Sequence, residues 1–246
     1  IEFLLSNGAN INGLYYDYYG PPVFVPCECL APDVLAMLVE LGADPAIEFT
    51  TPSSEVVTPL KMILGSYVRR PTHLHTCIEV LEMHGVTIED SPAMAVYRGE
   101  TNSLARHIES DPSVVREVHD FESANTPLHG ATLLHLASEA CELECARLLL
   151  DRGADVNAES SVDASGFGGQ TPIYHTVNSI WNAGFAVCEL LVERGANLLH
   201  RCSVRHLGYE RAFKQVTPLG YAIDMARDGA PHENVVALLE RHGGIC

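Results

Sequence analysis

Histidine and cysteine side chains, the common protein ligands of transition metals, lie close together at two places in this sequence. One is the run from His73 through His75 to Cys77, and the other is the pair Cys27 and Cys29. Neither has the C-x-x-C spacing of a structural zinc site, and on a helix His73 and Cys77 share a face that excludes His75. We therefore predict no bound metal and no cofactor, with a cluster that joins the two places as the weaker alternative.

The sequence also lacks the common catalytic motifs. The sequence has no G-x-S-x-G nucleophile elbow, no P-loop, no H-E-x-x-H pair and no Rossmann fingerprint. We predict that the chain has no catalytic residue and is not an enzyme.

The charge of the chain excludes two classes of partner. Its 246 residues contain 32 Asp and Glu against 15 Lys and Arg, a formal charge of −17. An acidic surface repels phosphate backbones and anionic lipids, so we predict binding to neither nucleic acid nor membrane. The eight cysteines are scattered, several on apolar helical stripes, which favours reduced thiols and a cytoplasmic protein.

The chain repeats itself. The segment from Thr132 to Ala158, TLLHLASEACELECARLLLDRGADVNA, recurs in looser form from Thr171 and Thr217, and earlier from Pro21 and Thr58. We predict one domain over 1–246, made of a half repeat and six full repeats: 1–12, 13–47, 48–90, 91–130, 131–169, 170–215 and 216–246.

Each repeat has the pattern of two antiparallel helices. A Thr-Pro pair such as Thr171-Pro172 begins a short first helix, because the hydroxyl caps an N–H group and proline needs no donor there. The second helix has an apolar stripe, as in Leu143 to Leu150, and Gly153 ends it with a left-handed conformation. Neither helix buries its apolar side alone, so neighbouring repeats must stack.

This pattern resembles the ankyrin-repeat family along essentially the whole chain. The resemblance lies in TLLHLA from Thr132, TPIYHT from Thr171, TPL at Thr58 and Thr217, and the repeat ends GADVNA, GANL and GADP. It implies an all-α solenoid of stacked antiparallel helix pairs with β-hairpin-like loops, called fingers. It also implies a non-catalytic scaffold that binds another protein, a monomer on its own, in which His135 is structural and bonds between neighbouring loops.

Two fingers have unusual compositions. Four of the nine tyrosines lie in the finger at 12–20, as Tyr15, Tyr16, Tyr18 and Tyr19. Tyrosine is enriched at protein interfaces, although packing on the neighbouring repeat is an equally open interpretation. The finger at 201–216 is basic in an acidic chain, and its Arg205 and Arg211 suit an acidic peptide or phosphate, unless they pair with nearby carboxylates.

The resemblance also implies a concave partner-binding face made of finger tips and the ends of the first helices. The candidate residues at those ends are Glu28, Arg98, Glu139, Asn178 and Asp224, with Trp181 as an anchor or as a cover for its own turn. An alternative function is a regulatory or targeting segment of a larger enzyme, since the sequence starts within a repeat.

Overall fold

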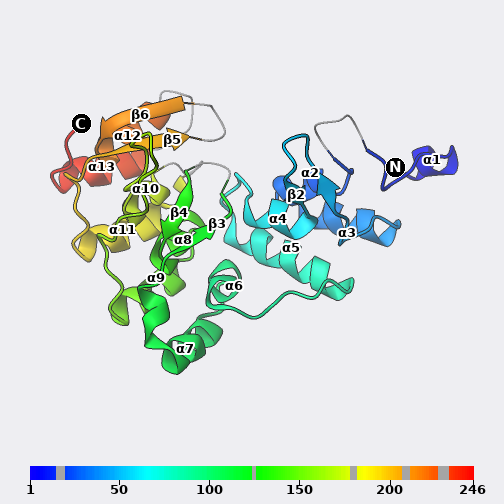
Figure 1. Ribbon diagram of the computed structural model, residues 1–246, viewed down its shortest axis with the longest axis horizontal. Helices are drawn as coiled ribbons and strands as arrows, with labels where there is room; N and C mark the ends of the chain where they lie inside the picture. Colours follow the sequence, from blue (N-terminus) through cyan, green and yellow to red (C-terminus); the bar gives the residue numbers. More distant parts are fainter. Residues whose placement is uncertain (15–19, 124–125, 178–181, 207–210, 227–232) are drawn as a thin grey trace. The chain divides into compact units, whose positions relative to one another are not determined.

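The computed structural model describes the chain from 1 to 246 except for residues 15–19, 124–125, 178–181, 207–210 and 227–232 (Figure 1). It forms two compact units. Unit 1 contains residues 1–68 and 72–89, and unit 2 contains residues 69–71 and 90–246.

Unit 1 is built of short helices and one small hairpin. In chain order its elements are α1 (Glu2–Ser6), α2 (Phe24–Glu28), α3 (Pro32–Glu40), β1 (Phe49–Thr50), β2 (Val56–Val57), α4 (Pro59–Leu64) and α5 (Pro71–Met83). The first helices α2 and α4 pack on each other, and α2 also packs on α3. The strands β1 and β2 pair antiparallel, with Phe49 opposite Val57, so this finger is a true hairpin.

Unit 2 contains the remaining elements. They are α6 (Pro92–Tyr97), α7 (Thr101–Ser110), the 3-10 turn η1 (Pro112–Val115), β3 (His119–Phe121), β4 (Leu128–Ala131), α8 (Leu133–Glu139), α9 (Leu143–Asp151), α10 (Pro172–Thr176), α11 (Phe185–Glu193), β5 (Cys202–His206), β6 (Arg211–Val216), α12 (Pro218–Ala226) and α13 (Glu233–Arg241).

The helices of unit 2 lie in two rows. The first helices α6, α8, α10 and α12 contact one another in that order, and the second helices α7, α9, α11 and α13 form the other row. The core of unit 2 includes Leu134 of α8, Leu149 of α9 and Tyr174 of α10, which are all fully buried. Stacked helix pairs are therefore present in unit 2, while the repeat boundaries and a solenoid over the whole chain stay predictions.

The ends of the helices agree with the sequence signals. The Thr58 hydroxyl accepts the Lys61 N–H at 3.2 Å, and the Ser91 hydroxyl accepts the Met94 N–H at 3.1 Å. Gly153 has φ +87°, and the N–H of Ala154 donates to the Leu149 carbonyl at 2.9 Å, which satisfies an end carbonyl. The same left-handed glycine follows the second helix at Gly8, Gly42, Gly85, Gly195 and Gly243.

The all-α class was too simple for the fingers. The described residues contain six short strands in three antiparallel pairs, β1–β2, β3–β4 and β5–β6, and each pair lies in a connection between helices. A hairpin pairs its backbone groups internally, which a projecting loop needs because no helix lies beside it. Among the helices in the described ranges, none is long and apolar enough to cross a membrane.

Candidate functional site

Three neighbouring fingers of unit 2 are joined by backbone hydrogen bonds. The N–H of Ser161, in the finger at 159–169, donates to the His129 carbonyl of β4 at 2.9 Å. On the other side, the N–H of Gly168 donates to the Ser203 carbonyl of β5 at 2.9 Å. The three fingers therefore form one continuous, internally bonded surface.

Gly130 allows this close approach of two fingers, and Gly168 allows a close approach within the middle finger. A Cβ atom on Gly168 would lie 2.0 Å from the Ser161 carbonyl oxygen, and one on Gly130 would lie 1.9 Å from the Ser161 hydroxyl. Both residues also have left-handed backbones, with φ of +128° and +56°. Any side chain at Gly168 would push apart the two arms of the middle finger, because Ser161 and Val162 lie in that same finger. The run Gly166 to Gly169 is thus a close-packed turn, in which all three glycines have positive φ angles.

A depression of about 340 Å³ lies on these fingers. We call its lining the finger surface, and its main side chains are Pro127, His129, Val162, Asp163, Phe167 and Arg205. The Arg205 guanidinium lies 4.6 Å from the centre of the Phe167 ring and 3.8 Å from the Asp163 carboxylate. Val162 is 60% exposed. The surface therefore presents an apolar side chain, an aromatic ring and a positioned cation together.

The Asp163 carboxylate organises the tip of the middle finger. It accepts the N–H groups of Phe167 at 2.9 Å and Ser165 at 2.8 Å. These hydrogen bonds, with the one from Phe167 as the largest cause, lower the pKa of Asp163 below its ordinary value, and Arg205 adds to the effect. The carboxylate stays charged at neutral pH and holds both the turn and Arg205.

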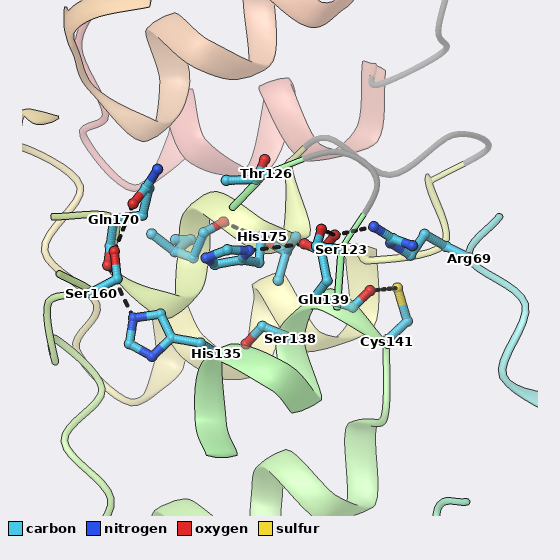
Figure 2. A network of polar contacts seen from close by, with 12 residues as sticks. Arg69, Ser123, Thr126, His135, Ser138, Glu139, Cys141, Ser160, Gln170 and His175 are labelled. Atoms are coloured by element: carbon cyan, nitrogen blue, oxygen red, sulfur yellow. Dashed lines mark hydrogen bonds and ion pairs between the residues drawn. The ribbon is translucent and has the colours of Figure 1, made fainter. Parts of the chain in front are cut away.

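A buried network of charged side chains lies at the end of α8 (Figure 2). Glu139, at the end of α8, is 4% exposed. Its carboxylate accepts a hydrogen bond from the Arg69 guanidinium and another from the Ser123 hydroxyl at 2.9 Å, and the Nδ1 of His175 lies 2.9 Å from its second oxygen. Figure 2 shows Arg69 and His175 reaching the carboxylate from opposite sides.

The network keeps the buried carboxylate charged. Burial alone raises the pKa of Glu139, but the Arg69 guanidinium, the His175 ring and the Ser123 hydroxyl outweigh burial, so the pKa is lowered overall. The expectation that Glu139 faces a partner needs correction, because a buried carboxylate must be paired inside the protein. Sequence reasoning missed Arg69, which lies 70 residues from Glu139 in the chain.

His135 forms the link between neighbouring repeats that the resemblance implied. Its Nδ1 accepts the Thr132 N–H at 3.1 Å, and its Nε2 lies 3.0 Å from the Gln170 carbonyl at the next repeat (Figure 2). The neutral tautomer with a proton on Nε2 satisfies both contacts. Burial, followed by the neighbouring His175, lowers the pKa of His135 to about 3.

The other predicted site residues are placed as follows. Glu28 is exposed at the end of α2 in unit 1, and Arg98 is half-buried after α6 with its guanidinium 4.0 Å from Glu100. Asp224 is half-buried in α12, and the Arg211 guanidinium lies 5.0 Å from the centre of the Phe213 ring in β6. Of the predicted site residues that the structure describes, Arg205 alone lines the finger surface. Outside the described residues are Tyr15, Tyr16, Tyr18, Tyr19, Asn178 and Trp181.

The histidines and cysteines of unit 1 have other partners. The Nδ1 of His73 lies 2.9 Å from the Leu30 carbonyl, and the Cys29 sulfur lies 3.4 Å from the Tyr67 hydroxyl. Burial raises the pKa of Cys77 to about 12, which keeps this thiol protonated at neutral pH. In the described part of the chain, no three His, Cys, Asp or Glu side chains gather as metal ligands. All eight cysteines are free thiols.

Comparisons with known proteins agree with the repeats seen in the structure. Residues 93–202 match the family model described as ankyrin repeats in three copies. The search of curated proteins found no match. One similar solved structure is the human ASB11 ankyrin repeat domain, 20% identical with a TM-score of 0.42, covering 100% of this chain and 92% of that one. Another is the ankyrin repeat domain of Bcl-3, a unique member of the IkappaB protein family, 18% identical with a TM-score of 0.38 over 97% and 90% of the two chains.

The matched range includes the TLLHLA box, its His135 link to the next repeat and the helix rows that stack around it. Residues 93–202 of this chain are therefore ankyrin repeats.

Proposed function

We propose that this chain is a non-catalytic scaffold that binds another protein through its fingers and its first-helix face. Ankyrin repeats are in general modules for protein–protein interaction, and no enzyme family is indicated for this chain. The observation that carries the proposal is the finger surface of unit 2, where three fingers are hydrogen-bonded into one platform with a depression.

The finger surface has the properties of a preformed binding site. Its backbone is held by hydrogen bonds between the fingers, so little conformational entropy is lost when a partner binds. Arginine and aromatic side chains are the residue types that contribute most to interface affinity, and Arg205 and Phe167 are positioned against each other. The half-exposed Arg205 offers its remaining N–H donors to an acidic group of the partner.

One end of the first-helix face, Glu139 of α8, differs from the expectation that it contacts a partner. In unit 2 the Glu139 carboxylate at the end of α8 is buried and paired with Arg69, so we place the proposed contacts of unit 2 on the fingers. Glu28, Arg98, Arg211 and Asp224 stay candidate contacts, as do the predicted residues outside the described ranges. The alternative role as a regulatory or targeting segment of a larger enzyme stays a prediction.

The test compares partner capture by the chain and by a variant of its finger surface. Affinity capture from cells followed by mass spectrometry identifies partners of the unchanged chain. We expect the double variant Phe167→Ala/Arg205→Ala to lose them. The matched control Met83→Ala/Arg147→Ala removes an exposed apolar side chain and an exposed cation elsewhere, and it should retain them.

Thermal melts followed by circular dichroism establish that both variants are folded. A folded finger variant that captures the same partners as the unchanged chain would contradict the proposed role of the finger surface.

A further inference from the structure

Unit 1 has an extreme charge composition. Its residues include eleven Asp and Glu but only one Lys or Arg, Lys61, a formal charge of −10 out of the −17 of the whole chain. Ten of the eleven carboxylates lie in the described residues, and all ten are exposed. The single cation is engaged within the unit, since the Lys61 ammonium donates to the Glu55 carboxylate at 2.6 Å. Unit 1 therefore presents a strongly negative surface.

An apolar groove opens on this negative unit. It lies between α2, the β1–β2 finger and α4, has a volume of about 220 Å³, and is lined by Phe24, Val25, Glu28, Phe49, Thr51, Val57 and Met62. We call it the unit 1 groove. The rings of Phe24 and Phe49 meet edge to face, with centroids 6.2 Å apart, and Val25 is 55% exposed. Its walls are thus built of packed rings and aliphatic side chains that solvent reaches.

One carboxylate stands directly at the groove. Glu28 is the last residue of α2, and the Ser66 hydroxyl donates to its backbone carbonyl at 2.6 Å, which fixes the end of this helix. The Glu28 side chain is exposed. The pKa of Tyr67 is raised to about 12. The largest cause is the hydrogen bond to Cys29, followed by burial of the ring, and the charges of Cys29 and Glu28 add to the effect. The apolar groove therefore has one exposed carboxylate in its lining, on a helix end whose backbone is held by Ser66.

We propose that the unit 1 groove binds a basic segment of a partner protein, with one large apolar side chain in the groove and Lys or Arg side chains facing Glu28. This inference rests on the proposed function as a protein-binding scaffold and adds the chemistry of the bound segment. It concerns surfaces of unit 1 that the finger surface of unit 2 does not include.

Size and charge select this occupant over others. The volume of the groove is below the roughly 300–1,000 Å³ of pockets that enclose a small molecule or cofactor, but it suits one side chain of a peptide. Screening acts over about 10 Å at 0.1 M salt, so nearby carboxylates of the unit attract a bound cationic segment. The same field repels acidic or phosphorylated segments and nucleic acid.

The test selects peptides on the intact chain from a random peptide library displayed on phage. We expect the selected peptides to have one apolar residue flanked by Lys and Arg. A labelled selected peptide, measured by fluorescence anisotropy, should bind about ten-fold more weakly to Val25→Ser and about five-fold more weakly to Glu28→Gln. Raising the salt from about 0.05 to 0.3 M should also weaken its binding, because the ion pairs are exposed.

Matched controls are Val56→Ser, a similarly exposed valine of β2 that is not part of the groove lining, and Glu79→Gln, an exposed glutamate of α5. Both should bind the peptide as the unchanged chain does. Neutral or acidic selected peptides, no selected peptides, or equal loss in the control variants would overturn the proposal. Loss of peptide binding only in the Phe167→Ala/Arg205→Ala variant would also overturn the proposal for the unit 1 groove, but it would support the finger surface. The two proposals can therefore fail separately.

Discussion

The buried His135 makes the stability of unit 2 depend on pH in a direction that the structure defines. Its ring is fully buried and accepts the Thr132 N–H, which requires the neutral form. Its pKa is lowered to about 3 in the folded protein, against about 6.5 in an unfolded chain. Between these values the unfolded state binds one more proton than the folded state, so stability is complete above pH 6.5 and is lost as the pH falls.

The expected size of the effect follows from the same pKa values. Each pH unit in this window changes the free energy of unfolding by about 1.4 kcal/mol, so acidification from pH 7 to pH 5 should cost about 2 kcal/mol through His135 alone. The variant His135→Asn keeps an oxygen that accepts the Thr132 N–H but loses the contact with Gln170 and the titration. We expect this variant to be less stable than the unchanged chain at pH 7 by about 1 kcal/mol. Its free energy of unfolding should also fall less on acidification.

Urea titrations at pH 7, 6 and 5, followed by circular dichroism, measure both quantities. The difference between the unchanged chain and His135→Asn isolates this histidine from the other eleven. His242→Asn is the control, because His242 is exposed after α13. The free energy of unfolding of this variant should fall with pH by the same amount as that of the unchanged chain. Equal losses for the unchanged chain and His135→Asn would refute the reasoning.

Two further predictions concern the buried network and the joined fingers of unit 2. Glu139→Gln should destabilise the fold by about 3 kcal/mol in urea titrations at pH 7, because Arg69 loses its buried carboxylate, whereas the exposed Glu144→Gln should cost under about 0.5 kcal/mol. Gly168→Ala should lower the melting temperature more than Gly153→Ala does. Both residues have positive φ, but of the two only the Gly168 position lacks room for a Cβ. Equal shifts in melting temperature for the two variants would contradict the close approach of Gly168 to Ser161.

Local sequence signals predicted the helix pairs because their causes are local. A Thr or Ser before proline caps the start of a helix by accepting the backbone N–H three residues further along, as Thr58 and Ser91 do. Glycine ends a helix because it adopts φ values that other residues avoid, as Gly153 does. The fingers were located from the extra length between repeats. Their hairpin-like form was expected from the family resemblance, whereas the strand register, such as Phe49 opposite Val57, comes from the structure because it depends on partners across the turn.

The candidate site was less predictable than the fold. Arg205 was identified from its unusual charge in an acidic chain, and it lies on the finger surface. Phe167 and Asp163 were missed because nothing in their own segment shows which neighbouring finger they meet. The glycine run beside them was the available signal, since adjacent glycines permit close approach of another backbone.

By itself the sequence determined the repeats, the helix ends, the acidic charge and the links through His135, since each depends on residues within one repeat or on the family pattern. Only the tertiary structure decided which charges are buried. Glu139 has the spacing of an exposed first-helix residue, yet Arg69, Ser123 and His175 enclose it from three other segments. Burial of a carboxylate is favourable only when such partners converge, and their convergence is a property of the packed chain.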